Sequence, residues 1–121
     1  MAEKAYDVVW GVKGSVVAKW TGLQNGDTGK PFEGYHMADK CVQVVGVFGV
    51  GGKVAIQGSN MVTSPIWAAV VDPQGNILEF TVAGLEAILE DPLKLRPSVV
   101  AGDANTLLDV YLKASAVMSL D

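Results

Sequence analysis

Short apolar segments alternate with turn residues along the chain, with a repeat of roughly 12 residues. Within Ser15–Thr21, Val16, Ala18 and Trp20 share one face of an extended chain, a period of two that is typical of a half-buried strand. The strands predicted in this way are Tyr6–Trp10, Ser15–Thr21, Cys41–Gly49, Lys53–Ser59, Ile66–Val71, Ile77–Val82, Leu93–Ala101 and Thr106–Ala114. This series predicts an all-β fold, an eight-stranded antiparallel β-sandwich of the jelly-roll type.

One short connecting helix is predicted near residues 83–90. Leu85, Ile88 and Leu89 fall on one side of such a helix. Asp91 ends it, because Asp91 precedes a proline and the residue before proline avoids the α region.

Turn residues predict how some of the strands are connected. Gly51 and Gly52 separate two apolar segments and predict a hairpin between them. Asp72–Asn76 predicts a second hairpin, because Pro73 presets φ and the later glycine and asparagine accept positive φ. The segment Leu23–Lys40 is long, polar and rich in glycine, which is typical either of a binding loop or of a flexible surface excursion.

The composition predicts a subunit of a larger assembly. The 121 residues suit one domain, 1–121, with a short N-terminal arm at 1–5 and a C-terminal tail at 115–121. Apolar residues make up 50% of the chain, and charged residues make up 18%, against a usual charged share of about 25%. A small domain cannot bury that much apolar surface, so we expect some of it to contact another protein.

The net charge and the single cysteine indicate which partners to exclude and in which compartment the protein is made. The net charge is −4 and the basic residues are scattered, so neither nucleic acid nor an acidic membrane is expected as a partner. No apolar segment follows the N-terminal residues, so no signal peptide is expected. Cys41 has no second cysteine with which to form a disulfide, which suits synthesis in a reducing cytoplasm.

Candidate catalytic and metal-binding residues are few. His36 is the single histidine and no nucleophile-elbow sequence is present, so we do not expect an enzyme. Zinc is not expected, because structural zinc takes four ligands, mainly cysteine and histidine, and the chain holds only His36 and Cys41. Calcium binding through Asp27, Asp72 or Asp103 stays an alternative to their use in turns. The glycine-rich segment after residue 45 matches neither nucleotide-binding pattern, and no cofactor is expected.

The second half of the chain carries a recognisable series of motifs. They are Val54-Ala55-Ile56-Gln57-Gly58-Ser59-Asn60, Trp67, Asp72-Pro73-Gln74-Gly75-Asn76, Phe80, Gly84-Leu85-Glu86-Ala87-Ile88-Leu89-Glu90, Arg96-Pro97 and Gly102-Asp103. Over residues 41–114 this series resembles the small decoration (cement) proteins of tailed bacteriophage capsids, a group with jelly-roll members. The resemblance implies a non-enzymatic virion protein on the capsid surface, made in the bacterial host cytoplasm. It also implies a homo-oligomer, expected as a homodimer or homotrimer. Such a protein binds the major capsid protein on the outer surface of the head and stabilises the shell by bridging its subunits.

The predicted interface residues carry apolar side chains outside the clearly alternating strands. They lie in the first strand, the long loop and the C-terminal tail, and they are Tyr6, Val8, Trp10, Phe32, Tyr35, Val117, Met118 and Leu120. Another virion location, in the tail or at the head–tail junction, stays open.

A carbohydrate-binding module of a phage fibre or host-recognition protein is the alternative function. The Gly58-Ser59-Asn60 motif and the tryptophan that follows it also resemble the discoidin-like, galactose-binding sandwiches. Met61-Val62 stands where those sandwiches often have Asp-Gly. The three tryptophans, Trp10, Trp20 and Trp67, are expected either to anchor the core or to present an aromatic surface to a partner or a sugar.

Overall fold

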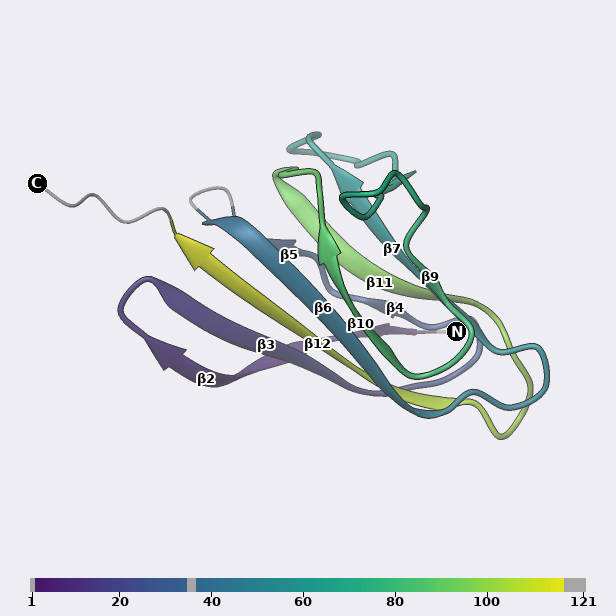
Figure 1. The fold of residues 1–121 in the computed structure, drawn as a ribbon. Helices are drawn as coiled ribbons and strands as arrows, with labels where there is room; N and C mark the ends of the chain where they lie inside the picture. The colour runs from purple at the N-terminus through teal and green to yellow at the C-terminus, as the bar shows by residue number, and fades with distance from the viewer. Residues whose placement is uncertain (1, 35–36, 117–121) are drawn as a thin grey trace, which may run out of the picture.

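The computed structural model describes residues 2–34 and 37–116, which form two β-sheets and no helix (Figure 1). The strands are β1 (Glu3–Lys4), β2 (Tyr6–Val12), β3 (Ser15–Leu23), β4 (Thr28–Gly29), β5 (Phe32–Glu33), β6 (Met37–Val47), β7 (Lys53–Ser59), β8 (Ala68–Ala69), β9 (Glu79–Phe80), β10 (Gly84–Ile88), β11 (Lys94–Ala101) and β12 (Leu107–Ala116). The predicted all-β fold and its sandwich-like pair of sheets are confirmed.

The two sheets differ in how regular they are. The five-stranded sheet has the order β10-β6-β12-β3-β2 and every pair in it is antiparallel. The seven-stranded sheet follows the path β1-β4-β11-β7-β8, with β5 paired to β11 and β9 paired to β7. Its β1–β4 pair is parallel. The chain passes repeatedly from one sheet to the other, for example between β6 and β7 and between β11 and β12, so each layer contains strands from distant parts of the sequence.

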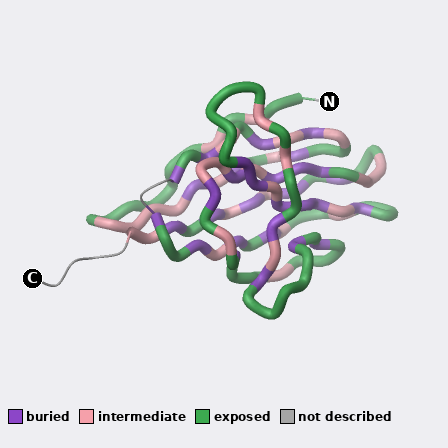
Figure 2. The backbone as a smooth tube through the Cα atoms, turned by 90° about the horizontal axis from the view of Figure 1, so that it is seen from above, coloured by how far each residue is buried: buried purple, intermediate pink, exposed green. Residues whose placement is uncertain are grey.

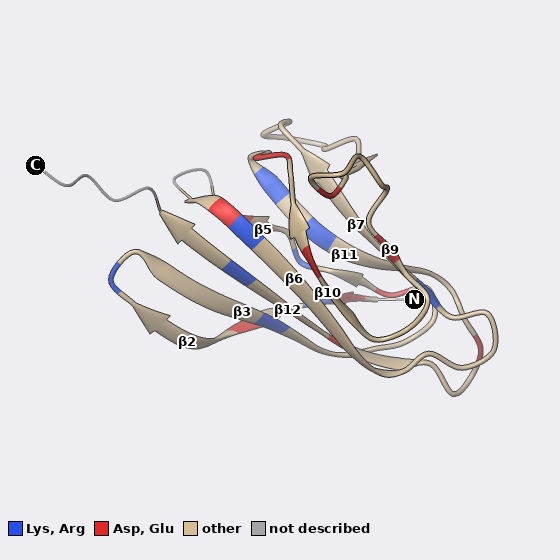
Figure 3. Ribbon diagram, in the orientation of Figure 1, with Lys and Arg blue, Asp and Glu red and all other residues tan. Residues whose placement is uncertain are grey.

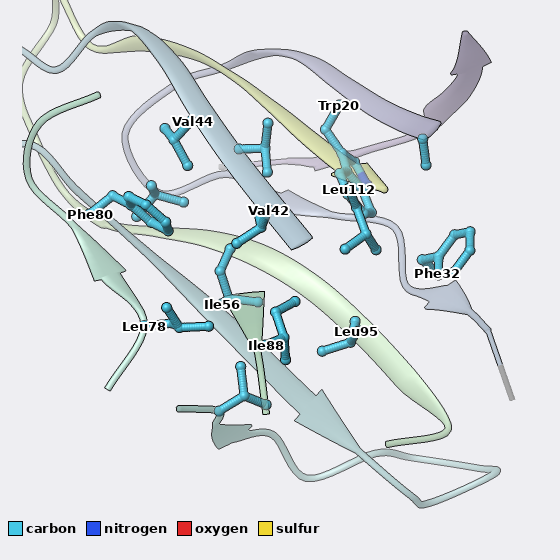
Figure 4. Close-up of a cluster of buried hydrophobic side chains, with 14 of the residues drawn as sticks. Trp20, Phe32, Val42, Val44, Ile56, Leu78, Phe80, Ile88, Leu95 and Leu112 are labelled. Atoms are coloured by element: carbon cyan, nitrogen blue, oxygen red, sulfur yellow. The ribbon is translucent and has the colours of Figure 1, made fainter. Parts of the chain in front are cut away.

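The hydrophobic core lies between the sheets, where alternate residues of the long strands meet (Figure 4). The five-stranded sheet contributes Trp20, Val42 and Leu112, and the other sheet contributes Ile56 and Leu95, all of them buried. Burying each such side chain stabilises the fold by about 1.5–3 kcal/mol. Figure 2 shows buried and more exposed positions alternating along the strands, while loop positions are largely exposed.

The helix predicted near residues 83–90 is wrong, because this segment forms the edge strand β10. It runs antiparallel to β6, with Leu85 opposite Gln43 and Ala87 opposite Cys41. A helix this short is marginal on its own, whereas pairing with a long neighbouring strand satisfies the backbone groups. The apolar residues whose spacing indicated a helix lie on different sides of this strand: Leu85 is exposed, and Ile88 is buried in the core.

The predicted count of eight strands is also wrong, since the described residues contain twelve. The additional strands include β1, β4 and β5, each of two residues, and such short strands leave no alternation to detect. β4 and β5 place the long segment before β6 at the seven-stranded sheet, where both pair with β11. At the predicted N-terminal arm, the Thr28 amide donates to the Ala2 carbonyl at 2.9 Å and the Lys30 amide donates to the Lys4 carbonyl at 2.7 Å.

The two predicted hairpins have different outcomes. The one at Gly51 and Gly52 is wrong, because β6 and β7 belong to different sheets and the glycines lie in a connection between layers. The turn at Asp72–Asn76 is confirmed: the Asp72 amide donates to the Asn76 carbonyl at 2.9 Å, and Gly75 has a φ of 87°. Val71 and Ile77 form an antiparallel bridge beside this turn.

Candidate functional site: apolar interaction surfaces

The first candidate, which we call the hairpin surface, consists of Val8, Val9, Trp10 and Val12 of β2. These side chains are 48–59% exposed, although they belong to a regular strand of seven residues. Among the strands that the structure describes, β2 is the terminal one of its sheet and pairs with β3 alone. The β2–β3 hairpin carries little charge along its length (Figure 3). A long, exposed, apolar edge strand is a surface on which another chain can pair.

The base of the hairpin is fixed by aromatic packing. The Tyr6 ring lies 5.4 Å from the Trp20 ring and 5.7 Å from the Phe32 ring, centroid to centroid, both edge to face. Trp20 is buried and its indole nitrogen donates to the Lys30 carbonyl at 3.0 Å. Tyr6 is half-buried, and beyond it the strand leaves the core. This aromatic packing attaches the start of β2 to the core of the sandwich.

The predicted interface residues lie in different environments in the structure. Val8 and Trp10 are exposed on the hairpin surface, whereas Phe32 is buried in the core and so cannot contact a partner in this conformation. Tyr6 supports the hairpin. Tyr35, Val117, Met118 and Leu120 lie outside the described residues, as does His36. Val9 and Val12 were missed, because alternation does not indicate that a strand is exposed on both faces.

The second candidate is a hollow on the outer face of the five-stranded sheet, with a volume of about 320 Å³. Its lining residues come from four strands and are Val17, Cys41, Gln43, Leu85, Tyr111 and Lys113. Lys19 lies beside the hollow, 5.1 Å above the centre of the Tyr111 ring and 3.8 Å from the Asp109 carboxylate. The hydrogen bond with Tyr111 is the main reason that the pKa of Lys19 is raised.

Cys41 contributes a thiol to this hollow. It is partly buried, and desolvation raises the pKa of the thiol, while the positive charge of Lys113 acts in the opposite direction. A raised pKa lowers the thiolate fraction at neutral pH, and the thiolate is the nucleophilic form. The chemistry of Cys41 is therefore that of a weakly reactive thiol.

The third candidate, which we call the loop surface, consists of Met61, Val62 and Ile66 between β7 and β8. Val62 and Ile66 are each 74% exposed. Hydrogen bonds fix this loop: the Lys94 ammonium donates to the Val62 carbonyl at 2.9 Å, and the Leu93 amide donates to the Asn60 side-chain oxygen at 2.8 Å. Apolar side chains held outward by an anchored loop are typical of a contact surface. Met61 and Ile66 also line an adjacent hollow of about 370 Å³.

The three tryptophans have three different environments. Trp20 is a core anchor, whereas Trp10 is exposed on the hairpin surface. Trp67 is half-buried, and the Arg96 guanidinium lies 4.3 Å from the centre of its ring. Arg96 is held in turn by the Gln57 side-chain oxygen at 2.9 Å. Because Arg96 covers Trp67, Trp10 is the more accessible of the two for a partner.

The aspartates considered for calcium use their oxygens within the fold. Asp72 accepts the backbone amides of Gln74 and Asn76, both at 2.9 Å. Asp103 accepts the backbone amide of Val50 at 2.8 Å, which ties the β6–β7 connection to the β11–β12 turn. These hydrogen bonds lower the pKa of both carboxyl groups. Within residues 2–34 and 37–116, no group of three His, Cys, Asp or Glu side chains has an arrangement suited to a metal ion.

The comparisons with known proteins identify the fold. No family model and no curated protein sequence matches the chain. Among solved structures, the fold is similar to that of the SPBc2 prophage-derived protein YomS, with a TM-score of 0.61 over 91% of this chain and 100% of that chain. The sequence identity is 11%, so the likeness concerns the fold alone. No helix in the described part of the chain is long and apolar enough to cross a membrane.

Proposed function

We propose that this protein is a non-enzymatic structural protein of a phage virion, a decoration (cement) protein of the capsid. In this role it binds the major capsid protein on the outer surface of the head and stabilises the shell by bridging capsid subunits. It acts on the virion surface after synthesis in the cytoplasm of the bacterial host. A fold shared with a prophage-derived protein supports a phage origin.

The observation that carries the proposal is the presence of several apolar surfaces on different parts of one sandwich. The hairpin surface lies at the edge of the five-stranded sheet, and the loop surface lies beyond β7 of the other sheet (Figure 1). Val50, in the connection that follows β6, and Leu107, the first residue of β12, are exposed as well. Exposed apolar patches mark protein contacts. A protein that bridges subunits needs more than one contact surface, whereas an enzyme or a sugar-binding module needs one concave site.

We assign the contact with the shell to the loop surface. Val62 and Ile66 project from a loop whose backbone is already held by Lys94 and Asn60, so little conformational entropy is lost when they are covered. Thr63, also exposed, lies between them in the sequence. The adjacent hollow, lined by Gly58, Pro92 and other residues, can receive an apolar side chain of the capsid protein.

The experiment measures binding to undecorated shells assembled from the major capsid protein of the same phage. We expect saturable binding and shells that withstand a higher temperature once decorated. Val62→Ser combined with Ile66→Ser is expected to weaken binding about tenfold or more, as burial of two large apolar side chains is lost. Thr63→Ala is the matched control and is expected to bind like the wild type. Failure of the wild-type protein to bind these shells contradicts the proposal.

A carbohydrate-binding function is favoured by one observation, the exposed indole of Trp10. A glycan array separates the two functions, because sugar binding predicts hits that Trp10→Ala abolishes. The decoration function predicts no such hits and shell binding that depends on the loop surface.

A further inference from the structure

Within residues 2–34 and 37–116, β2 has a strand partner on one side of its backbone only, because it ends the five-stranded sheet. Its pairing with β3 contains a bulge: Val8 lies opposite Ala18 and Trp10 lies opposite Val17, so Val9 has no partner of its own. The free edge is seven residues long and apolar over most of its length. Such an edge is normally shortened, charged or covered in proteins that stay monomeric.

We propose that β2 pairs antiparallel with β2 of a second copy of this chain, about a two-fold axis that passes between Val9 and Trp10. The pairing joins two five-stranded sheets into one continuous sheet across the dimer. It concerns a surface other than the loop surface, and it does not rest on shell binding.

The bulge restricts the register of this pairing. Directly opposite residues share a face of a sheet, so Asp7 lies on the outer face with Lys19, and Val8 lies on the core-side face with Ala18. Trp10 lies on the outer face with Val17. The alternation of faces along β2 is therefore interrupted at Val9, so that Val8 and Trp10 lie on opposite faces. A strand that pairs with β2 must have the same interruption when read in the opposite direction.

A second β2 meets this condition in the register centred between Val9 and Trp10. Val9 of each copy then lies opposite Trp10 of the other, Val8 lies opposite Gly11, and Asp7 lies opposite Val12. The pairs Val8–Gly11 and Asp7–Val12 each join residues on the same face, and a shift by one residue breaks this agreement. A shift by two residues keeps it but moves Asp7 away from Lys13 of the other copy. The register also covers Val9 and Trp10, which are about half exposed in the single chain.

The charges at the two ends of β2 favour the same arrangement. Asp7 lies near the start of the strand, and Lys13 follows its last residue, Val12, in the β2–β3 turn. Antiparallel pairing about the central axis brings Asp7 of each copy alongside Val12 and Lys13 of the other. Opposite charges therefore meet at both ends of the paired strands, which favours antiparallel over parallel pairing.

Two-fold symmetry also favours pairing of β2 with β2 of a second copy over pairing of β2 with β10. Pairing of β2 with β10, the other edge of the same sheet, is a head-to-tail contact that adds further copies until the subunits form a ring or an open chain. Pairing of β2 with β2 uses the same edge twice and closes. The assembly then stops at a dimer, and β10 and the loop surface remain accessible.

The first test measures native mass by light scattering on a sizing column. We expect twice the mass of the 12.7 kDa chain for the wild type. Val9→Lys is expected to weaken the dimer at least tenfold, because it places two ammonium groups beside the axis. Val47→Lys is the matched control, an exposed valine of β6, and should leave the dimer intact. A monomeric or trimeric wild type, or a Val9→Lys variant as dimeric as the wild type, overturns the inference.

The second test examines the register by cross-linking in a Cys41→Ser background. Val8→Cys combined with Gly11→Cys puts thiols directly opposite one another across the axis, within the 4.4–6.8 Å range of Cα separation that a disulfide requires. We expect a covalent dimer after mild oxidation. Val8→Cys combined with Val12→Cys is the control, because these positions are on opposite faces. Cross-linking of the control pair in place of the first pair overturns the register. Neither outcome depends on shell binding.

Discussion

The ion pair between Lys40 and Asp91 predicts an asymmetric loss of stability. The Lys40 side chain is fully buried at the start of β6, where its ammonium donates to the Met37 carbonyl at 2.6 Å and to the Asp91 carboxylate. The Asp91 side chain is 49% exposed. Removing either partner breaks the same contact, but the group left behind has a different environment in each case.

Asp91→Ala leaves a buried ammonium with one carbonyl as partner, and Lys40→Met leaves a carboxylate that water already reaches. An uncompensated buried charge costs about 3–5 kcal/mol, and the exposure of Asp91 places this variant near the lower end. Lys40→Met keeps the apolar packing of the stem and loses hydrogen bonds whose net contribution is about 0.5–1.5 kcal/mol each. One of the two lost bonds goes to the half-exposed Asp91 carboxylate, so we expect Lys40→Met to destabilise the protein by about 1–2 kcal/mol and Asp91→Ala by about 3 kcal/mol.

The assay is equilibrium unfolding in urea of both single variants and the double variant. Lys40→Met should partly rescue Asp91→Ala, because it removes the ammonium that Asp91→Ala leaves unpaired. If Lys40→Met costs as much as Asp91→Ala, or if the double variant shows the sum of both losses, the reasoning from burial is refuted.

Three further predictions concern packing, pH and thiol chemistry. Gly29→Ala should lower the free energy of unfolding by about 1–3 kcal/mol in urea, because the added Cβ would lie 2.5 Å from the Trp20 indole nitrogen. Gly75→Ala, which adds no contact within 4 Å, should show only the smaller cost of its positive φ. Hydrogen bonds lower the folded-state pKa of Asp103, so its stabilisation is present above the ordinary aspartate pKa and is lost as the pH falls below it. The melting temperature should then fall less in acid for Asp103→Asn than for the wild type. Cys41 should react with a disulfide reagent at neutral pH more slowly than free cysteine, and equal rates would contradict its raised pKa.

Long strands with clear alternation can be predicted from the sequence because their pattern repeats. β7 has the predicted bounds, Lys53–Ser59. β3 ends two residues later than predicted, and β12 begins one residue later and ends two residues later. In each of these strands one face must be buried, so the alternation of its side chains indicates the strand. The turn at Asp72–Asn76 was equally predictable, because its residue types have strong backbone preferences.

Elements that depend on a distant partner could not be predicted in this way. β10 has helical spacing in its own sequence and becomes a strand because β6 lies beside it. β4 and β5 have two residues each, and their pairing with β11 involves a segment more than fifty residues further along the chain. The sheet crossing after β6 looks like a hairpin locally, since two glycines allow either path.

The sequence predicted only part of the candidate surfaces, because apolar character does not show which residues the fold buries. Trp10 was identified from its apolar character near the N-terminus, whereas Phe32 has the same character and is buried. Apolar character alone does not separate a core residue from a contact residue, because both are hydrophobic. The loop surface gave a weak signal: Met61 and Val62 are consecutive apolar residues between a strand and Pro65, without alternation.

Bridging of capsid subunits is the central claim, and electron cryomicroscopy of shells saturated with this protein tests it most directly. We expect added density at symmetric positions on the outer surface of the head. In each copy the loop surface should contact the shell, and each dimer should contact at least two capsid subunits. Density in which each copy or dimer touches a single capsid subunit, or shells that gain no density, would contradict the claim.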